Sequence, residues 1–262
     1  MPSGVVLPSM KRTIIIGDVH GCIAEFSELL RKLAFVKGED RLILVGDLMD
    51  RGPDPVACVK LARECGAEAV LSNHDEKHIR FRKHEAVSMT TGRKNPMRFP
   101  AEKSAQNAAL SDQDIEWFRG LPLMLEAVPG LVVVHAGLEP AFPANEQPSD
   151  VVIRVRYVNS DGKMVGFKDG SLDQPSNTVY WTEQWKGPES VIYGHAVHSM
   201  TEPRIDRFDG GACYGIDTGC AFGGSLCAMV LAPGWGVNDP AVFVQVRAAR
   251  EYLPKHRRVN ES

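Results

Sequence analysis

GDVHG, at residues 17–21, is the segment from which the architecture of this chain can be worked out. GDLMDRG at 46–52 and SNHD at 72–75 follow it, and each of the three comes after an apolar run. Two histidines repeat the arrangement, since His135 follows LVVV and His195 follows VIYG. Strands that end in coordinating side chains bring those side chains together at the carboxyl edge of a sheet. The five segments therefore predict a hydrolytic site for two metal ions.

The first 75 residues alternate between strand-like and helix-like patterns. Residues 12–16, 41–45 and 67–71 are apolar runs typical of buried strands. Between them, residues 23–35 repeat apolar side chains at helical spacing, and a helix opens at Pro55. We expect it to end at about Cys65, with a further helix after His74. This β-α-β-α-β order predicts parallel strands joined by right-handed crossovers.

The remaining sequence predicts helices first and strands afterwards. Residues 77–120 are expected to form a helical insertion over the sheet. Turn signals at 129–130, 159–162 and 209–211 then separate strand-like runs, with further strands at 190–194, 213–217, 225–231 and 241–246. The fold class is therefore α/β, a single domain of two packed mixed β-sheets flanked by helices. Residues 1–11 are expected to be a flexible leader and 249–262 a frayed tail.

The composition narrows the functional classes. Of the 262 residues, 44% are hydrophobic and 24% charged, as in soluble globular proteins. A net charge of −3 gives no global reason to expect a nucleic acid or membrane partner, and no apolar run is long enough to span a bilayer. None of the six cysteines forms a Cys-x-x-Cys pair, and we recognise no signal peptide. We therefore expect free thiols and a cytoplasmic protein.

The candidate ligands form a mixed oxygen and nitrogen set. Asp18 and His20 lie two residues apart, so both face the same side of an extended segment. Asp47 suits a bridging position, because a carboxylate has two oxygens to share between two cations. Asn73 would supply an amide oxygen, and His135 and His195 would each supply an imidazole nitrogen. A set without thiolate favours Mn, with Fe or Zn as alternatives, over a structural zinc.

Each of these residues also has an ordinary structural interpretation. An Asp beside a Gly is usually a turn former, and a single His after a strand is more often a partly buried side chain than a ligand. Asn73 would also serve as a helix N-cap. Turns and caps do not account for six ligand-type residues that end five strands in order, so we prefer the metal site.

The five motifs resemble those of the calcineurin-like metallophosphoesterases, in the phosphoprotein-phosphatase branch. There they read GDxHG, GDxxDRG, GNHE, HGG or HAG, and GH. Within this branch the chain is most similar to the symmetrical bis(5'-nucleosyl)-tetraphosphatases, because Asp75 ends the third motif and the segments 154–157 and 217–220 resemble theirs. The chain departs from the pattern at Ser72, which replaces Gly, while Asp50-Arg51 has the protein-phosphatase form.

The resemblance implies a role for each residue. One metal ion would be bound by Asp18, His20 and Asp47, and the other by Asp47, Asn73, His135 and His195. A hydroxide that bridges the ions would attack phosphorus in line. The general acid would be His74, oriented by Asp50. Phosphate oxygens would be bound by Asn73, Arg51 and a second arginine, which is either Arg154 or Arg156.

Three functions are compatible with these residues. The leading one is the cleavage of diadenosine tetraphosphate, a small-molecule dinucleoside polyphosphate, into two ADP. The second is a small Ser/Thr or Tyr protein phosphatase with the same site. The third is a non-catalytic scaffold, which the complete set of ligands makes the least favoured. The basic stretch 77–103 would hold polyphosphate or form a solvated helix face, and Tyr180, Trp181 and Trp185 would stack adenine or pack in the core.

Overall fold

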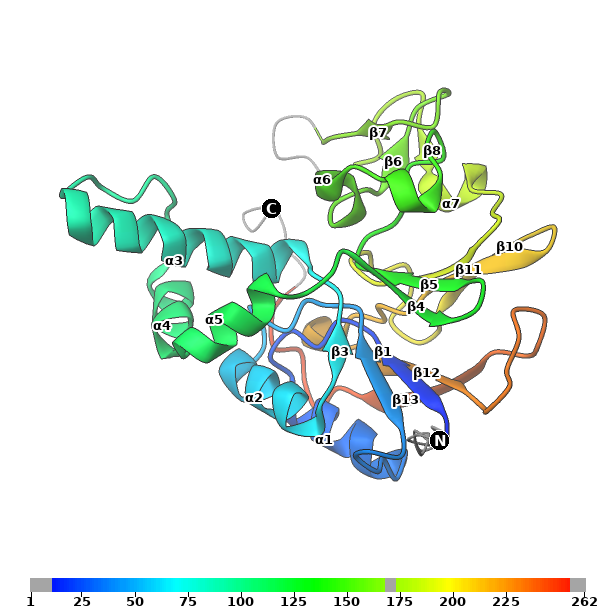
Figure 1. The fold of residues 1–262 in the computed structure, drawn as a ribbon, viewed down its shortest axis with the longest axis horizontal. Helices are drawn as coiled ribbons and strands as arrows, with labels where there is room; N and C mark the ends of the chain where they lie inside the picture. Colours follow the sequence, from blue (N-terminus) through cyan, green and yellow to red (C-terminus); the bar gives the residue numbers. More distant parts are fainter. Residues whose placement is uncertain (1–10, 168–172, 255–262) are drawn as a thin grey trace, which may run out of the picture.

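Two five-stranded mixed β-sheets pack face to face, as the sequence predicts (Figure 1). The arrangement comes from a computed structural model that describes residues 11–167 and 173–254. The first sheet has the order β13-β12-β1-β2-β3, with β1 (Thr13–Ile16), β2 (Arg41–Leu44), β3 (Glu68–Ala69), β12 (Ser225–Leu231) and β13 (Val242–Arg247). The second has the order β10-β11-β9-β5-β4, with β4 (Met124–Val128), β5 (Leu131–Val134), β9 (Ser190–Tyr193), β10 (Arg204–Phe208) and β11 (Gly211–Gly215).

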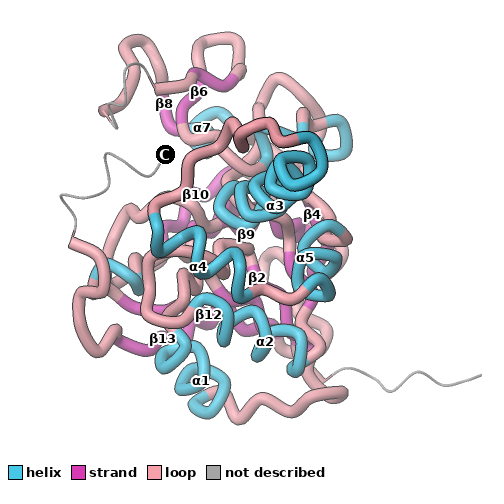
Figure 2. Tube along the Cα trace, turned by 90° about the vertical axis from the view of Figure 1, so that its left-hand side faces the viewer, coloured by secondary structure: helices cyan, strands magenta, loops and turns pink. Residues whose placement is uncertain are grey.

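A small third sheet and the helices surround this sandwich. The small sheet has the order β7-β6-β8, with β6 (Tyr157–Val158), β7 (Met164–Val165) and β8 (Val179–Tyr180). The α-helices are α1 (Ile23–Lys32), α2 (Pro55–Cys65), α3 (Asn73–Thr91), α4 (Ala101–Ala109), α5 (Asp112–Arg119), α6 (Ser149–Val152) and α7 (Trp181–Gln184). Short 3-10 turns are η1 (Ala144–Glu146) and η2 (Cys220–Phe222). In Figure 2, α1 and α2 lie together on one side of the sandwich, with α4 and α5 above them.

Parallel pairing brings the predicted strand ends to one edge. β1 pairs in parallel with β2, and β2 with β3, as the β-α-β-α-β order predicts. In the second sheet, β9 pairs in parallel with both β5 and β11. β12 runs antiparallel to β1 and β13, which makes the first sheet mixed. The loops that follow β1, β2, β5 and β9 therefore carry their side chains toward a common region.

The central strands are apolar on both faces because each sheet is covered on both sides. Ile14 and Ile16 pack in the cluster beneath α1 and α2. Ile15, between them in sequence, points the other way and packs against the second sheet in a cluster that includes Val133 and Ile192. This alternation is the period-two geometry of a strand, and it fixes which side of β1 faces the second sheet.

Local signals set the helix ends. Pro55 stands at the first position of α2, the Asp54 side chain accepts from the Ala57 amide at 2.9 Å, and Gly66 ends the helix at φ 69°. α3 begins at Asn73, two residues earlier than expected. Its N-cap is Ser72, whose hydroxyl accepts from the Asp75 amide at 3.1 Å. The serine that replaces the usual glycine therefore caps the helix that carries Asn73.

The expectation of a frayed tail differs from the structure over residues 249–254. The Ala249 amide donates to Glu25 on α1 at 2.9 Å, and the Tyr252 hydroxyl donates to the same carboxylate at 2.8 Å. These contacts hold the segment against α1, and a sequence scan could not foresee a partner 224 residues away. The expected leader lies almost wholly outside the described residues, as do residues 255–262.

The cysteines and the helices can be compared with the expectations from composition. All six cysteines are free thiols, and five of them are buried. Among the described residues, no helix combines the length and the apolarity needed to cross a bilayer.

Candidate active site

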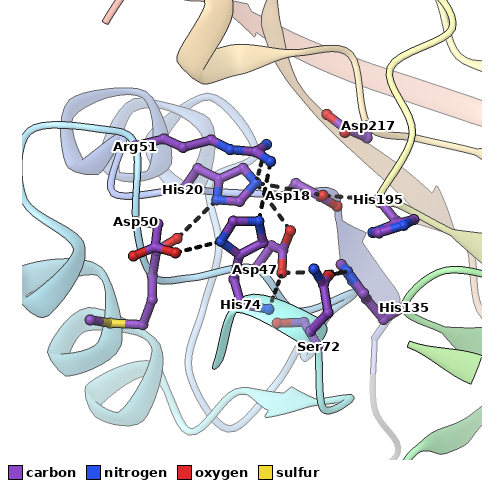
Figure 3. Close-up of polar contacts among 12 residues, drawn as sticks. Asp18, His20, Asp47, Asp50, Arg51, Ser72, His74, His135, His195 and Asp217 are labelled. Carbon is purple, nitrogen blue, oxygen red and sulfur yellow. Dashed lines mark hydrogen bonds and ion pairs between the residues drawn. The ribbon is translucent and has the colours of Figure 1, made fainter. Parts of the chain in front are cut away.

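The predicted ligands converge between the two sheets (Figure 3). Asp18 and His20 follow β1, and Asp47 follows β2. The other three stand at the start of α3, after β5 and after β9, and are Asn73, His135 and His195. Each is buried except His195, which is partly exposed. Backbone bonds join the first two loops, since the His20 amide donates to the Asp47 carbonyl at 2.7 Å.

Backbone strain is concentrated at this site. Seven non-glycine residues in the described part of the chain have positive φ, and five belong to the site: His20 (43°), Asp47 (51°), Asp50 (68°), Arg51 (68°) and His195 (65°). Each such conformation costs on the order of 1–3 kcal/mol and persists only where the surroundings impose it. The strained residues coincide with the predicted site, and strain of this kind clusters at active sites and ligand clamps.

His20 presents a lone pair to the centre of the site. Its Nδ1 donates to the Met49 carbonyl at 2.9 Å, so Nε2 carries no proton in the neutral ring. That Nε2 lies 3.1 Å from Asp47 Oδ2 and 4.0 Å from Asp18 Oδ2. Arg51 Nη1 donates to the same nitrogen at 2.6 Å. The atoms that face Nε2 are therefore two carboxylate oxygens and a cation, the surroundings of a metal ligand.

His135 shows the same arrangement on the other side of Asp47. Its Nδ1 donates to the Val45 carbonyl at 2.8 Å, which leaves Nε2 as an acceptor. Nε2 then faces Asn73 Oδ1 at 2.9 Å and Asp47 Oδ1 at 3.4 Å, and these are acceptors as well. Burial lowers the pKa of His135, so the ring stays neutral and supplies no bridging proton. Acceptors that converge without a proton fit a bound cation.

Two triads of ligand atoms are close enough to hold one ion each. His20, Asp47 and His74 form one, and Asp47, His135 and His195 form the other, with ligand atoms within 4.8 Å of one another in each. Asp47 belongs to both, as expected of a bridge (Figure 3). Asp18 lies beside the first triad and accepts from the His195 amide at 2.9 Å. It thereby joins the loops after β1 and β9.

The buried carboxylates of the site are further evidence for a bound cation. Asp18 Oδ1 and Asp217 Oδ2 are buried without a hydrogen-bond partner. Burial, then the charges of Asp217 and Asp47, raises the pKa of Asp18 well above its usual range. A divalent ion would offset this repulsion, so the residues fit the metals that the fold family implies. Sequence reasoning missed Asp217 as a site residue, although it stands at the end of a predicted strand as the ligands do.

The predicted dyad of Asp50 and His74 is formed. His74 Nδ1 donates to Asp50 Oδ2 at 2.5 Å, and His74 Nε2 lies 3.2 Å from Arg51 Nη2 (Figure 3). Burial opposes ionisation of Asp50, but the donors from His74 and His78 outweigh it and hold the pKa of this carboxyl well below its usual range. Burial lowers the pKa of His74 to about 3, against the attraction of Asp47.

A cavity of about 400 Å³ opens beside the ligands. Arg51, Arg154 and Arg156 all line it. Arg154 Nη2 pairs with Glu76 Oε2 at 3.0 Å. Arg156 donates from Nη2 to the His195 carbonyl at 3.2 Å, whereas its Nε is buried without a hydrogen-bond partner. The two arginines that the sequence did not distinguish therefore differ in how strongly they are already engaged.

The aromatic side chains divide between core and cavity. Trp181 and Trp185 are 0% and 3% exposed and pack on the outer face of the second sheet, as the packing alternative predicts. The cavity is lined instead by Phe167 and Phe222, which sequence reasoning missed, by Tyr157 of the segment 154–157, and by Tyr180. No periodic pattern distinguishes these rings from core aromatics, because their position depends on how the small sheet and the η2 turn are placed against the site.

The basic stretch 77–103 serves more than one purpose. Lys77 lines the cavity, in agreement with a role toward polyphosphate. Lys103 points instead to Asp50, with Nζ 2.9 Å from Oδ2. Arg82 is used within the helices, where it donates to Asn107 Oδ1 at 3.1 Å. Only part of the stretch is therefore placed to meet an anionic substrate.

Known proteins resemble this chain along most of its length. A model described as calcineurin-like phosphoesterase matches residues 11–199. The symmetrical bis(5'-nucleosyl)-tetraphosphatase of Aromatoleum aromaticum is 40% identical, over 90% of this chain and 97% of the relative. The asymmetrical bis(5'-nucleosyl)-tetraphosphatase PrpE of Anoxybacillus flavithermus is 30% identical, over 92% and 98%. A solved structure provisionally described as a diadenosine tetraphosphatase superposes with a TM-score of 0.69, at 28% identity over 92% and 96%.

Proposed function

The chain belongs to the calcineurin-like phosphoesterase family, and from that premise we propose that it hydrolyses diadenosine tetraphosphate to two ADP. The observation that carries the proposal is the pair of acceptor clusters that share Asp47, beside a cavity lined by three arginines. Clustered acceptors suit metal ions, and clustered guanidinium groups suit a polyphosphate chain. The relative at 40% identity, named as a symmetrical hydrolase, supports the position of cleavage.

The proposed metal ligands are the two clusters together with the neighbouring Asp18 and Asn73, except for His74 of the first cluster, which is proposed below as the general acid. Asp18, His20 and Asp47 would hold one ion, and Asp47, Asn73, His135 and His195 the other. Asp217, with its free buried oxygen, is an additional candidate beside Asp18. Two divalent ions, Mn in the first place with Fe or Zn as alternatives, would lower the pKa of a shared water and supply a nucleophile near neutral pH.

Arg51 and Arg156 are the proposed phosphate clamps. Arg51 stands between His20 and His74 with its two terminal nitrogens 2.6 and 3.2 Å from the imidazoles. Arg156 is the preferred second clamp because its buried Nε–H lacks a partner, and an unsatisfied buried donor gains most from an anionic ligand. Arg154, already paired with Glu76, would contribute less.

His74 is proposed as the general acid. The bond from Nδ1 to Asp50 fixes the ring so that Nε2 faces Arg51 and the cavity. Burial holds the pKa of His74 at about 3, so Nε2 would take up a proton only when an anionic phosphate lies beside it, and would then pass that proton to the departing phosphate oxygen. Asp50 orients the imidazole and stabilises its protonated form.

The cavity aromatics are proposed to bind the nucleoside. Tyr157 and Phe167 meet edge to face with centroids 5.9 Å apart, and Arg156 lies over the Phe167 ring at 5.6 Å. Aromatic faces beside a cation are suited to stacking a base next to its phosphates. The free thiols support the proposal that the enzyme acts in the cytoplasm.

The test compares two substrates with one Mn-reconstituted preparation. Diadenosine tetraphosphate and a phosphoserine peptide are assayed side by side, and the nucleotide products are resolved. ADP as sole product, with much weaker peptide hydrolysis, would support the proposal. ATP with AMP would overturn the symmetrical cleavage, and hydrolysis of the peptide alone would make the chain a small protein phosphatase.

A further inference from the structure

We propose that His78 and Lys103 are positioning residues, which hold the Asp50 carboxylate so that His74 stays aimed at the substrate. The inference rests on the proposed function, since it takes His74 as the general acid. Both residues come from the basic stretch 77–103, which follows the first three motifs, and the sequence assigns neither of them a role of its own.

Three side-chain donors bind the Asp50 carboxylate. Oδ2 accepts from His74 Nδ1 at 2.5 Å and from Lys103 Nζ at 2.9 Å. Oδ1 accepts from His78 Nε2 at 3.1 Å. The carboxylate is 1% exposed, so no bulk solvent competes for these positions. With both oxygens bound, it cannot rotate without breaking at least one bond in a buried environment.

The hydrogen bonds of His78 to its other neighbour fix which ring nitrogen donates. Its Nδ1 lies 3.2 Å from the Asn107 amide nitrogen, which also donates to the His78 carbonyl at 2.9 Å. Asn107 cannot present its oxygen there, because that oxygen accepts from Arg82 Nε at 3.1 Å. His78 Nδ1 is therefore an acceptor, and its single proton lies on Nε2, directed at Asp50.

The chain of donors has one direction. Arg82 donates to Asn107, Asn107 to His78, and His78 to Asp50. His78 and Asn107 are 0% and 2% exposed. Every bond in such a buried series must be satisfied, or the series costs more than an apolar contact would.

Aromatic packing also connects this region. Phe99, between α3 and α4, stacks on Phe81 with centroids 4.1 Å apart and interplanar angle 3°, and its ring lies 5.0 Å from that of His78. Apolar contacts of this kind would secure α3 and α4 without the desolvation cost of a buried histidine, amide and lysine. What the polar series adds is a defined orientation of Asp50.

The principal experiment is a double-mutant cycle on diadenosine tetraphosphate hydrolysis. His78→Leu should lower kcat by up to the loss that His74→Asn causes on the same substrate, with KM changed less than twofold. His78→Gln, which retains an N–H near the position of Nε2, should recover most of the loss. In a His74→Asn background, His78→Leu should slow the enzyme less than twofold further. Equal losses in both backgrounds would overturn the proposal.

Matched controls separate positioning from folding. His84→Leu makes the same change on the same helix, and Lys83→Met matches Lys103→Met at an exposed lysine. Both should retain wild-type kcat, whereas Lys103→Met should lower it. Metal content and the melting temperature are measured for every variant. If His78→Leu and His78→Gln both lose kcat in proportion to a loss of bound metal or of folded protein, His78 has a purely structural role.

A second readout does not depend on the substrate. Side-chain nitrogen NMR of the zinc-loaded protein should find His78 as the Nε2–H tautomer, and the His78 signals should shift in Asn107→Ala. A His78 ring in the Nδ1–H tautomer would overturn the inference. If diadenosine tetraphosphate is not hydrolysed but the tautomer is as expected, the proposed function fails and the arrangement around Asp50 stands.

Discussion

His135 Nε2 lies 2.9 Å from Asn73 Oδ1, and neither atom has a proton to give the other. The His135 proton is held on Nδ1 by the Val45 carbonyl. Two lone pairs that face each other at hydrogen-bond distance repel unless a cation lies between them. This pair is therefore the most direct structural sign of a metal site in the chain, and it leads to the first prediction.

Divalent metal should stabilise the folded protein. Mn²⁺ at a hundredfold excess over its dissociation constant would contribute about 2.7 kcal/mol, which is roughly 5–10 °C in Tm for a domain of this size. Differential scanning fluorimetry of chelator-treated protein, with and without Mn²⁺, measures the shift. His135→Ala should lose part of it. A wild-type Tm that does not respond to Mn²⁺, Fe²⁺ or Zn²⁺ would contradict the metal site.

Gly194→Ala should abolish activity by displacing Asp18. A Cβ at residue 194 would collide with Asp18 Oδ1, in a loop that also positions His195. We expect the metal content to fall and kcat to fall at least tenfold, because Asp18 is a proposed metal ligand and loses its position. Gly166→Ala is the control, because a Cβ there meets nothing within 4 Å. Normal metal content in Gly194→Ala would show that the loop adjusts.

Arg156→Met should weaken substrate binding more than Arg154→Met does. Removing a charged donor from a phosphate costs about 1.5–3 kcal/mol, so the KM for diadenosine tetraphosphate should rise roughly ten- to hundredfold. Arg154 is partly neutralised by Glu76, so its loss should change KM less than threefold. Steady-state kinetics on both variants decide the order. A larger effect at Arg154 would reverse the assignment of the second clamp.

His74→Asn should slow phosphoester hydrolysis far more than tetraphosphate hydrolysis. ADP leaves as a weakly basic phosphate, whereas a serine side chain leaves as a strongly basic alkoxide. Help from a general acid matters most for the poorer leaving group. The ratio of variant to wild-type kcat on the two substrates tests this, and equal ratios would remove His74 from the role of acid.

Asp40→Asn should destabilise the protein near neutral pH but not in acid. Burial opposes ionisation of Asp40, but Arg12 and the Val36 amide outweigh it and hold the pKa of this carboxyl below its usual range. A lowered pKa contributes stability above the unfolded value of about 3.9, and the contribution is lost as pH falls through the folded pKa. Urea unfolding at pH 7 and pH 3 should show the gap between wild type and variant closing. Asp161→Asn, at an exposed turn, should leave stability unchanged at both.

Much of the fold and the metal-ligand set could be predicted from local pattern. α2 runs from Pro55 to Cys65 as expected, because proline, the Asp54 cap and Gly66 are signals contained within the helix and its ends. Asp18 and Asp47 converge because the parallel strands β1 and β2 share an edge, and the packing of the second sheet on the first adds His135. Such features depend on residues near in sequence, or on a topology that the order of elements already implies.

The remaining features depended on contacts between distant segments. Lys103 reaches Asp50 across 53 residues, and Glu25 binds the Ala249 amide across 224. Arg154 and Arg156 look alike in sequence, yet Glu76 on another element engages only the first. A side chain's role at such positions is set by the partner that packing brings to it, and free energy of burial, rather than local spacing, selects that partner.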